Sequence, residues 1–349
     1  MIKRRISRPI NVGGVKVGGG ARVVIQSMTK TDTRDVSATL NQINRLAECG
    51  CGIVRLAVPD MDAADSLGRI KKSSPIPLIA DIHFDHRLAV ASINSGVDQV
   101  RFNPGNIRGD EKIAEIVRCA SERSLPLRIG VNAGSLAHKR DEAELATLMA
   151  EAALDQVRLL EDMNYDLIEI SLKASDVMTT IEANKLIALK TPYPLHIGIT
   201  EAGLPGPGSI RSAVGLGVLL YEGLGDSLRV SLTTPDPCEE VLAGLDILHS
   251  LELMDSTPRL ISCPTCGRCE AEGFFELAGA IEKELRKLEK PVTVAVMGCV
   301  VNGPGEARDA DVGLACGRGR GVIFKKGEKV ATVEETEFFS ALMKEISVL

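Results

Sequence analysis

The chain has 349 residues, of which 44% are hydrophobic and 25% charged, a mixture typical of a folded protein with one large domain or two domains. Its net charge of -6 and its aromatic content of only 3% disfavour a nucleic-acid binder. No apolar run approaches the roughly 18 residues that a membrane helix needs, and no signal peptide follows the basic N-terminus, so we expect a cytoplasmic protein without a membrane partner.

The first two thirds of the chain alternate between short β-runs and amphipathic helical stretches. The β-runs span residues 22–28, 53–58, 77–82, 99–102, 127–131, 167–171, 195–199 and 227–230. The clearest helical stretches between them span residues 38–48, 112–121, 142–162, 176–189 and 209–222. Eight such units in succession predict a (β/α)8 TIM-type barrel, because the competing doubly wound sheet rarely contains eight consecutive parallel units.

The two ends of the chain depart from this alternation. Ahead of the first β-run, residues 11–22 carry two glycine clusters between valines, which predicts a small hairpin at the bottom of the barrel. Beyond residue 256 the order becomes mixed, with helices at 273–288 and 335–346 and β-runs at 292–297, 312–315, 321–325 and 329–333. We therefore predict a barrel domain of residues 1–256, followed by a smaller α+β domain of residues 257–349.

Polar residues gather at the carboxyl ends of the predicted strands, where a barrel of this kind carries its active site. Five of these residues are cations, namely Arg55, Arg101, Arg128, Lys173 and Arg229. Such cations repel one another unless an anionic ligand compensates their charge, and both residue types suit phosphate oxygens. The pattern therefore predicts a substrate with more than one phosphate or carboxylate. Glu201 follows the seventh strand and is a candidate acid or base, or an ion-pair partner.

The chain has nine cysteines, an odd number that argues against a disulfide framework in a cytoplasmic protein. The CxxC loop of Cys263 and Cys266, with the remote Cys299, presents thiolates to one metal centre. The spacing favours an iron–sulfur cluster over zinc, which would have to recruit Cys269 or Cys316; inert buried thiols are the third alternative. The remaining cysteines, predicted to be small buried hydrophobic residues, are Cys49, Cys51, Cys119 and Cys238.

Segments along nearly the whole chain resemble a known family in order. They span residues 24–35, 53–59, 81–83, 100–105, 128–135, 170–175, 196–203, 226–232, 263–266 and 298–306. The last of them, GCVVNGPGE, is highly specific. In these segments the chain resembles the bacterial two-domain 4-hydroxy-3-methylbut-2-enyl diphosphate synthases of the non-mevalonate isoprenoid pathway.

The resemblance implies an iron–sulfur oxidoreductase that opens the ring of 2-C-methyl-D-erythritol 2,4-cyclodiphosphate and removes a hydroxyl, giving 4-hydroxy-3-methylbut-2-enyl diphosphate. Two electrons would come through a 4Fe-4S cluster, with flavodoxin or ferredoxin as the donor. Cys263, Cys266 and Cys299 would hold three irons, and Glu306 would supply an oxygen, a weaker ligand than thiolate, to the fourth. The family also implies a head-to-tail homodimer, in which the cluster domain of one chain closes the barrel of the other.

The resemblance further implies roles for the strand-end residues. Those that would grip the diphosphate and the diol are Arg55, Arg101, Asn103, Arg128, Asn132, Lys173, Arg229 and Ser231. Glu201 would be the polar partner near the reacting hydroxyl. Two positions depart from the family pattern: Lys30 stands where Asn is expected, and Cys269 creates a ferredoxin-like CxxCxxC run. That run leaves open whether Cys269, rather than Glu306, takes the fourth iron.

Three other interpretations compete with this one. The first is a barrel lyase or synthase that acts on a phosphorylated substrate and carries a structural zinc in its small domain. The second is a non-catalytic iron–sulfur sensor or carrier, which would not need the strand-end arginines. The third is a radical S-adenosylmethionine enzyme, which is disfavoured because no CxxxCxxC motif occurs early in the barrel.

Overall fold

The structure is a computed structural model, and it describes residues 2–103, 106–107, 109–136, 142–254, 258–269, 271–288, 290–299, 305 and 307–349. The chain divides into two compact units, Met1–Leu253 and Met254–Leu349. The domain boundary expected at residue 256 lies outside the described residues and stays a prediction. Within the described ranges, no helix combines the length and the apolar character needed to cross a bilayer.

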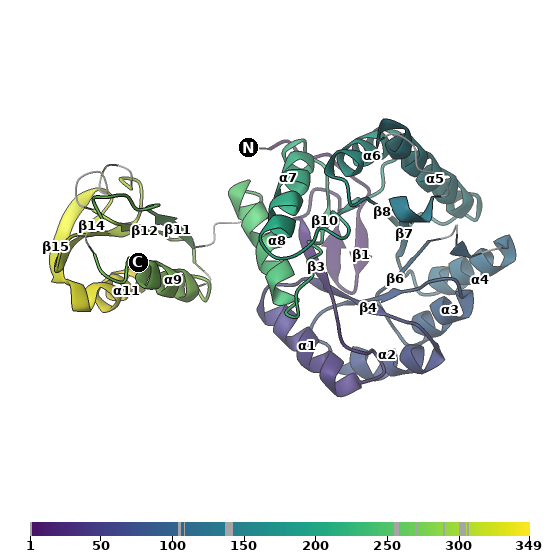
Figure 1. Cartoon of the computed structure of the whole chain (residues 1–349). Helices are drawn as coiled ribbons and strands as arrows, with labels where there is room; N and C mark the ends of the chain where they lie inside the picture. Colours follow the sequence, from purple (N-terminus) through teal and green to yellow (C-terminus); the bar gives the residue numbers. More distant parts are fainter. Residues whose placement is uncertain are drawn as a thin grey trace. The chain divides into compact units, whose positions relative to one another are not determined.

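The first unit is a parallel α/β barrel, as predicted. Its strands are β3 (Val24–Met28), β4 (Ile53–Ala57), β5 (Leu78–Asp81), β6 (Gln99–Phe102), β7 (Leu127–Asn132), β8 (Ile168–Lys173), β9 (His196–Ile197) and β10 (Ser227–Leu228). They pair in the order β8-β7-β6-β5-β4-β3-β10-β9. A parallel bridge between Ile170 and Leu195 joins the two ends of this sheet and closes the barrel. In Figure 1 the barrel is seen along its axis, with a ring of helices around the strands.

Each strand is followed by a helix that covers the outside of the barrel. The helices are α1 (Val36–Glu48), α2 (Met61–Ser73), α3 (His86–Asn94), α4 (Asp110–Ser121), α5 (Glu142–Asp162), α6 (Val177–Lys190), α7 (Pro207–Tyr221) and α8 (Cys238–Ser250), and a 3-10 turn, η2 (Ala133–Ser135), precedes α5. Aspartates begin several of them: Asp35, Asp60 and Asp176 accept hydrogen bonds of 3.0, 2.9 and 2.6 Å from backbone amides in the first turn. Such caps start the helices directly after the strand loops.

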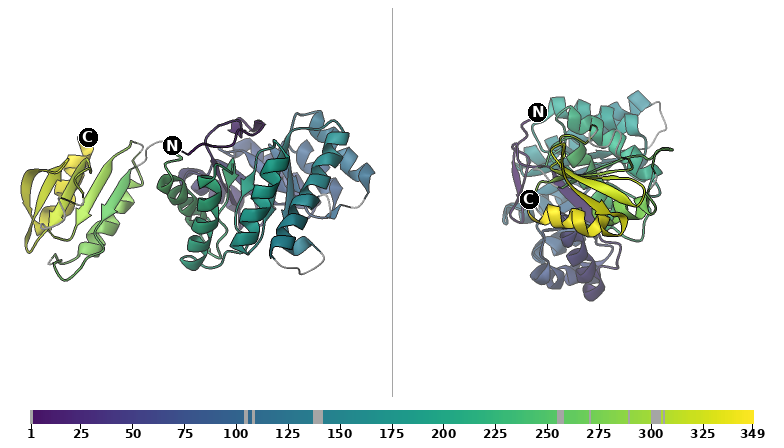
Figure 2. Two further views of the ribbon diagram at one scale, coloured as in Figure 1. Left: turned by 90° about the horizontal axis from the view of Figure 1, so that it is seen from above. Right: turned by 90° about the vertical axis from the view of Figure 1, so that its left-hand side faces the viewer.

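The predicted N-terminal hairpin is present and closes one end of the barrel. Strands β1 (Ile10–Val12) and β2 (Val15–Val17) pair antiparallel. Their apolar side chains pack against Ile53 and Ile79, at the beginnings of β4 and β5. Figure 2, left, shows this purple hairpin at one end of the barrel. The carboxyl ends of the strands therefore form the opposite, open end, which we call the barrel mouth.

The second unit is an α+β domain built on a mixed sheet, again as predicted. Its elements are β11 (Arg259–Ser262), α9 (Phe274–Leu285), β12 (Thr293–Met297), β13 (Val312–Cys316), β14 (Arg320–Lys325), β15 (Glu328–Glu334), the 3-10 turn η3 (Glu335–Glu337) and α11 (Phe338–Ser347). The strands pair in sequence order, parallel from β11 to β13 and antiparallel from β13 to β15. Apolar residues of α9 and α11 form one core with residues of this sheet. Strand β11 was not predicted.

One prediction about the cysteines is wrong. Cys49 and Cys238 are not free thiols but form a disulfide, with their Cα atoms 6.0 Å apart. Cys49 ends α1 and Cys238 begins α8, and these helices become neighbours because β10 pairs with β3 when the barrel closes. The two cysteines are 189 positions apart in the sequence, which hides this proximity. Cys51 and Cys119 are buried and free, as predicted.

Candidate functional site

The barrel mouth brings the five predicted cations together. Nη1 of Arg101 donates a 3.0 Å hydrogen bond to Oδ1 of Asp81, and Nε of Arg55 lies 3.7 Å from the other oxygen of the same carboxylate. Lys173 lies within electrostatic reach of all four arginines, since burial first and then these arginines hold the pKa of Lys173 well below its usual range. Burial also lowers the pKa of Arg55, to about 9, although Asp81 opposes the shift.

Two glycines make room for these side chains inside the barrel. A Cβ atom at Gly130 would lie 2.4 Å from Nε of Arg101, so the guanidinium rests directly on the backbone of β7. A Cβ at Gly198 would lie 2.8 Å from Nζ of Lys173 and 2.6 Å from the carbonyl oxygen of Arg229. A larger residue at either position would displace a cation from the mouth.

Glu240, on the first turn of α8, anchors a further part of the mouth. Its side chain is buried and accepts from Nη2 of Arg229 at 3.3 Å and from Oγ of Ser27 at 3.2 Å. The ammonium of Lys30 lies 3.4 Å from the same carboxylate. The residue that departs from the family pattern thus shares a carboxylate with one of the predicted substrate-binding arginines.

A fully buried group of polar side chains lies among the strands of the barrel. This polar network consists of Gln26, Gln99, Arg128, Glu169, His196 and Ser227. Nε of Arg128 donates to Glu169 at 2.8 Å, and its Nη2 donates to the amide oxygens of Gln26 at 2.6 Å and Gln99 at 3.0 Å. The guanidinium of Arg128 is therefore already engaged by the protein.

The sequence analysis missed five members of the polar network, although strand alternation contains a signal for them. Gln99 lies two residues before Arg101 and Ser227 two residues before Arg229, so each pair shares a face of its strand. Following this period of two from Arg101 and Arg229 back along their strands would have identified Gln99 and Ser227.

Cations outnumber carboxylates in the described part of the mouth. Five buried or half-buried cations, Arg55, Arg101, Arg128, Lys173 and Arg229, face three buried carboxylates, Asp81, Glu169 and Glu240. The exposed Lys30 and Glu201 add one charge of each sign at the same end. In addition, the Nε atoms of Arg55 and Arg229 are buried and have no hydrogen-bond partner among the described residues. Buried donors without partners and an excess of positive charge both favour an anionic ligand.

The other predicted site residues also follow strands of the barrel. Asn132 ends β7 and Asn103 follows β6, while Ser231 comes two residues after Arg229, and all three are half-buried. Glu201 lies in an exposed turn after β9 and has a φ of 52°. A side chain in this left-handed region costs about 1 kcal/mol or more. Six other described non-glycine residues share the conformation, so it does not by itself mark Glu201 as functional.

In the second unit, three predicted ligands line one pocket of about 400 Å³, namely Cys263, Cys266 and Cys299. Cys266 is exposed and the other two are half-buried. The backbone N–H of Thr265 donates to Sγ of Cys263 at 3.4 Å, and hydrogen bonds of this kind to sulfur ligands tune the potential of iron–sulfur clusters. No three potential ligands of the described residues converge on one metal position, so the thiols line the pocket without forming a closed set. The fourth predicted ligand, Glu306, lies outside the described residues.

Two further cysteines lie near this pocket. Cys316 is buried in the core, on β13, where burial raises the pKa of its thiol to about 12. A zinc site that needs Cys316 is disfavoured because this residue packs in the core and does not line the pocket. Cys269 packs beside Gly298, since a Cβ at that glycine would lie 3.0 Å from Sγ of Cys269 and 3.8 Å from Sγ of Cys263. Three thiols in an accessible pocket with a backbone amide donor fit an iron–sulfur cluster better than a closed zinc site.

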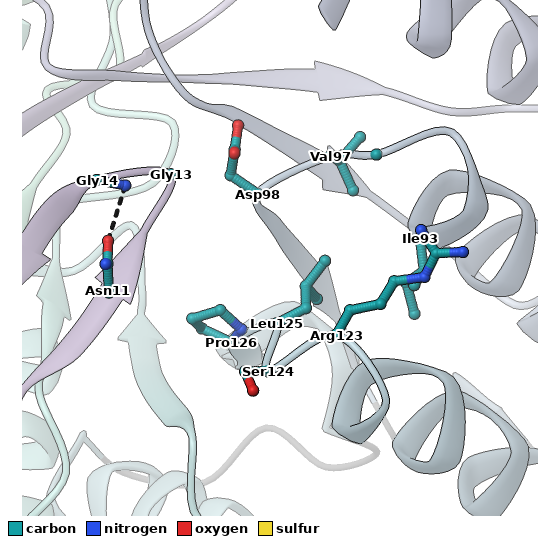
Figure 3. A pocket seen from close by; sticks show the side chains of 11 residues that line it. Asn11, Gly13, Gly14, Ile93, Val97, Asp98, Arg123, Ser124, Leu125 and Pro126 are labelled. Carbon is teal, nitrogen blue, oxygen red and sulfur yellow. Dashed lines mark hydrogen bonds between the residues drawn. The ribbon is translucent and has the colours of Figure 1, made fainter.

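A pocket of about 520 Å³ at the closed end of the barrel has a different character (Figure 3). It lies beside the turn of the N-terminal hairpin, where Oδ1 of Asn11 accepts from the backbone N–H of Gly14 at 2.7 Å. Asp98 is engaged by Lys71 at 2.5 Å and by the backbone N–H of Leu78 at 2.8 Å. Asn11 and Asp98, which line this pocket, are thus already engaged within the protein. The barrel mouth is the better candidate for the substrate site.

An α/β barrel with buried cations in excess at its mouth, followed by a domain with a cysteine-lined pocket, defines a two-domain enzyme of anionic substrates. The family model described as "GcpE TIM-barrel domain" matches residues 7–245, and the one described as "GcpE protein C-terminal domain" matches residues 259–348. The chain therefore belongs to the GcpE family, which confirms the resemblance identified in the sequence.

Full-length relatives agree with this membership. The chain is 53% identical over 350 residues to a protein of Dehalococcoides mccartyi, with 100% of both chains covered. It is 55% identical over 348 residues to a protein of Geobacter sulfurreducens, with 97% of both covered. Both relatives are named 4-hydroxy-3-methylbut-2-en-1-yl diphosphate synthase (flavodoxin).

Among solved structures, the barrel is similar to dihydropteroate synthase from Xanthomonas albilineans. The TM-score is 0.52 at 16% sequence identity, and the match covers 70% of this chain and 98% of that one. At this identity the likeness supports the barrel fold alone.

Proposed function

We propose that this chain converts 2-C-methyl-D-erythritol 2,4-cyclodiphosphate to 4-hydroxy-3-methylbut-2-enyl diphosphate by reductive ring opening and loss of a hydroxyl, in isoprenoid precursor biosynthesis. The observation that carries the proposal is the excess of buried cations at the barrel mouth, which suits a substrate with two phosphate groups. Membership of the GcpE family and the names of its full-length relatives favour this reaction over the lyase interpretation.

Within the mouth, Arg55, Arg101, Lys173 and Arg229 would donate to the phosphate oxygens. Among the described residues, Nε of Arg55 and Nε of Arg229 have no hydrogen-bond partner. Within the same residues Arg101 and Lys173 each make one hydrogen bond, whereas Arg128 makes three within the polar network. Arg128 would act by shaping the site and by adding positive charge beneath the substrate. The half-buried residues that would contact the remaining oxygens are Asn103, Asn132 and Ser231.

Glu201 would hold or move a proton at the reacting hydroxyl. Its turn follows β9, directly beyond the strand that lies beside Lys173, so it belongs to the same end of the barrel. A carboxyl group at this position would protonate the departing hydroxyl, which leaves as water.

The pocket of the second unit would hold a 4Fe-4S cluster through Cys263, Cys266 and Cys299, with Glu306 as the fourth ligand. When bound, the cluster supplies the two electrons that the reaction consumes. We propose flavodoxin as the donor rather than ferredoxin, since the names of the relatives specify it. The cytoplasmic location expected from the sequence stays a prediction.

The reaction is tested by anaerobic purification, metal and sulfide analysis, and an assay with reduced flavodoxin and the cyclic diphosphate. We expect a brown protein with about four irons and four sulfides per chain, and a product identified by phosphorus NMR and mass spectrometry. A colourless protein with stoichiometric zinc and no reductant-dependent conversion would instead support the barrel lyase.

The head-to-tail homodimer also stays a prediction, and mixing two inactive variants tests it. Arg101→Ala disables a barrel, while Cys299→Ala disables a cluster pocket. If the cluster domain of one chain serves the barrel of its partner, a mixed dimer contains one complete site and activity returns on mixing. If each chain uses its own cluster, the mixture stays inactive.

A further inference from the structure

A buried chain of hydrogen bonds connects Lys173 to the polar network through His196. The imidazole lies on β9 between the neighbouring strands β8 and β10. Its Nε2 is 2.9 Å from Nζ of Lys173, and its Nδ1 is 2.8 Å from Oγ of Ser227. The hydroxyl of Ser227 donates in turn to Oε1 of Glu169, at 2.6 Å.

Glu169 determines the direction of every hydrogen bond in this chain. Its carboxylate is paired with the guanidinium of Arg128 and can only accept. Ser227 has a single hydroxyl hydrogen, which it donates to Glu169, so its oxygen accepts from the Nδ1–H of His196. A neutral imidazole with its proton on Nδ1 carries a lone pair on Nε2, and that lone pair accepts a hydrogen from Lys173.

The surroundings of His196 keep the imidazole neutral. The side chain is buried, and burial lowers its pKa well below the usual range. The cations that face it lower the pKa further, and they are Arg128, Lys173, Arg55 and Arg229. Glu169 is the one carboxylate in this series of hydrogen bonds, and Ser227 separates it from the imidazole ring. Neutrality matters because a protonated imidazole would have no acceptor to offer Lys173.

Lys173 pairs with no carboxylate of the described residues, since none of them lies within ion-pair distance of its Nζ. Gly198 leaves the space in which the amino group lies, because a Cβ there would approach Nζ to 2.8 Å. Its hydrogen bond to His196 uses one of the N–H groups, and the others remain for a ligand.

We propose that His196 is a positioning residue, which as a neutral Nδ1–H tautomer accepts a hydrogen bond from Lys173 and aims its remaining N–H groups at the phosphate groups of the substrate. This inference rests on the proposed function, in which Lys173 binds the diphosphate. His196 itself touches no substrate atom and acts through Lys173.

Two substitutions separate the two halves of the imidazole. His196→Asn keeps an N–H at the place of Nδ1, and therefore the bond to Ser227, but removes the acceptor at Nε2. His196→Gln places an amide oxygen near the position of Nε2 and restores the acceptor for Lys173. His249→Gln is the matched control, since this histidine lies at the end of α8, outside the polar network.

The variants are compared as holoenzymes, by steady-state kinetics with the cyclic diphosphate and reduced flavodoxin. His196→Asn should raise KM about 10- to 100-fold, the effect of losing the orientation of one charged hydrogen bond, with a much smaller change in kcat. His196→Gln should recover most of this loss, and His249→Gln should match the wild type. Equal KM values for His196→Asn and the wild type would overturn the positioning role.

Two readouts judge the inference apart from the proposed reaction. Nitrogen NMR of histidine-labelled wild type should show His196 as a neutral Nδ1–H tautomer from about pH 6 to 8, with its signal assigned by loss in His196→Asn. An Nε2–H tautomer or an imidazolium would overturn the inference. Calorimetry with inorganic pyrophosphate should show weaker binding to His196→Asn than to His196→Gln. If both results hold but the wild type does not convert the cyclic diphosphate, only the proposed reaction is wrong.

Discussion

Replacing Gly130 by alanine should displace Arg101 from the barrel mouth while leaving the backbone in place. The added Cβ would lie 2.4 Å from Nε, 2.7 Å from Nη2 and 2.9 Å from Cζ of Arg101. Non-bonded heavy atoms are normally about 3.5 Å apart, so the guanidinium must retreat by roughly 1 Å. The three nearest atoms all belong to the side chain of Arg101, and none of them belongs to the backbone. Gly198→Ala would be less selective, because the carbonyl oxygen of Arg229 lies 2.6 Å from its added Cβ.

The cost follows from what Arg101 holds. Its guanidinium and the carboxylate of Asp81 are 3.0 Å apart, and both side chains are 7% exposed, so solvent screens the pair little. A buried hydrogen bond between charged groups contributes about 1.5–3 kcal/mol, which corresponds to roughly a 10- to 150-fold change in an equilibrium constant. A contact between this guanidinium and a phosphate oxygen would be a hydrogen bond of the same charged kind, so we expect a loss of this size in substrate affinity when the guanidinium is displaced.

Calorimetric titration of the oxidised holoenzyme with the cyclic diphosphate, without reductant, measures the affinity directly. Gly217→Ala is the control, since a Cβ at that position on α7 meets nothing within 4 Å. Wild-type affinity in Gly130→Ala would refute the reasoning and remove Arg101 from the substrate site. An equal loss in Gly217→Ala would show that the effect is not local to the mouth.

Three further predictions concern a buried amine and two groups of thiols. Binding of the cyclic diphosphate should weaken as pH rises, because the pKa of Lys173 is lower in the free protein than beside a bound anion. Calorimetry in buffers of different ionisation enthalpy should show that binding takes up protons, and the absence of proton uptake would contradict this prediction. Cys49→Ser should lower the free energy of unfolding by about 2–4 kcal/mol under oxidising conditions, because the disulfide with Cys238 is lost. The loss should be much smaller with a thiol reductant, which breaks the bond in the wild type as well. Equal denaturation midpoints of variant and wild type without reductant would exclude the bond. The Cys316→Ala variant should keep its iron, because this thiol packs in the core. The Cys299→Ala variant should lose its iron, while the circular dichroism of the barrel persists. Loss of iron from Cys316→Ala would show that Cys316 is a ligand.

Much of the fold could be predicted because each element carries its own local pattern. Helix α5 (Glu142–Asp162) and strand β6 (Gln99–Phe102) have the predicted bounds, since their periodic patterns end where the elements end. Strand β9 (His196–Ile197) is shorter than its apolar run, because the chain leaves the ladder at Gly198. Strand β11 (Arg259–Ser262) was missed because its short, half-buried segment has no clear pattern of its own. It becomes a strand by pairing with β12, which follows α9 in the sequence.

The cations of the site were easier to predict than their partners. Arg101 lies near the carboxyl end of β6 and Arg229 directly follows β10, and barrel topology alone brings them to the mouth. Glu240 lies on the first turn of a helix, where an acidic residue ordinarily faces solvent and favours the helix dipole. Here it is 1% exposed, because the turn of α8 packs over the mouth and directs the carboxylate at Arg229 and Lys30. The helical pattern contains no sign of this packing.

The register of the barrel explains why two neighbouring arginines play different parts. Asp81, Arg101, Arg128 and Glu169 are successive register partners across β5, β6, β7 and β8, so two cations lie side by side between two carboxylates. Each arginine turns to the carboxylate on its outer side, Arg101 at 3.0 Å and Arg128 at 2.8 Å, which relieves their repulsion. The amide oxygens of Gln26 and Gln99 accept two further hydrogen bonds from Arg128. Arg101 keeps donors for a ligand, while Arg128 fixes the carboxylate that orders Ser227 and His196. A sequence that marks both arginines only as strand-end cations cannot distinguish them, because their roles depend on which side chains meet across the closed barrel.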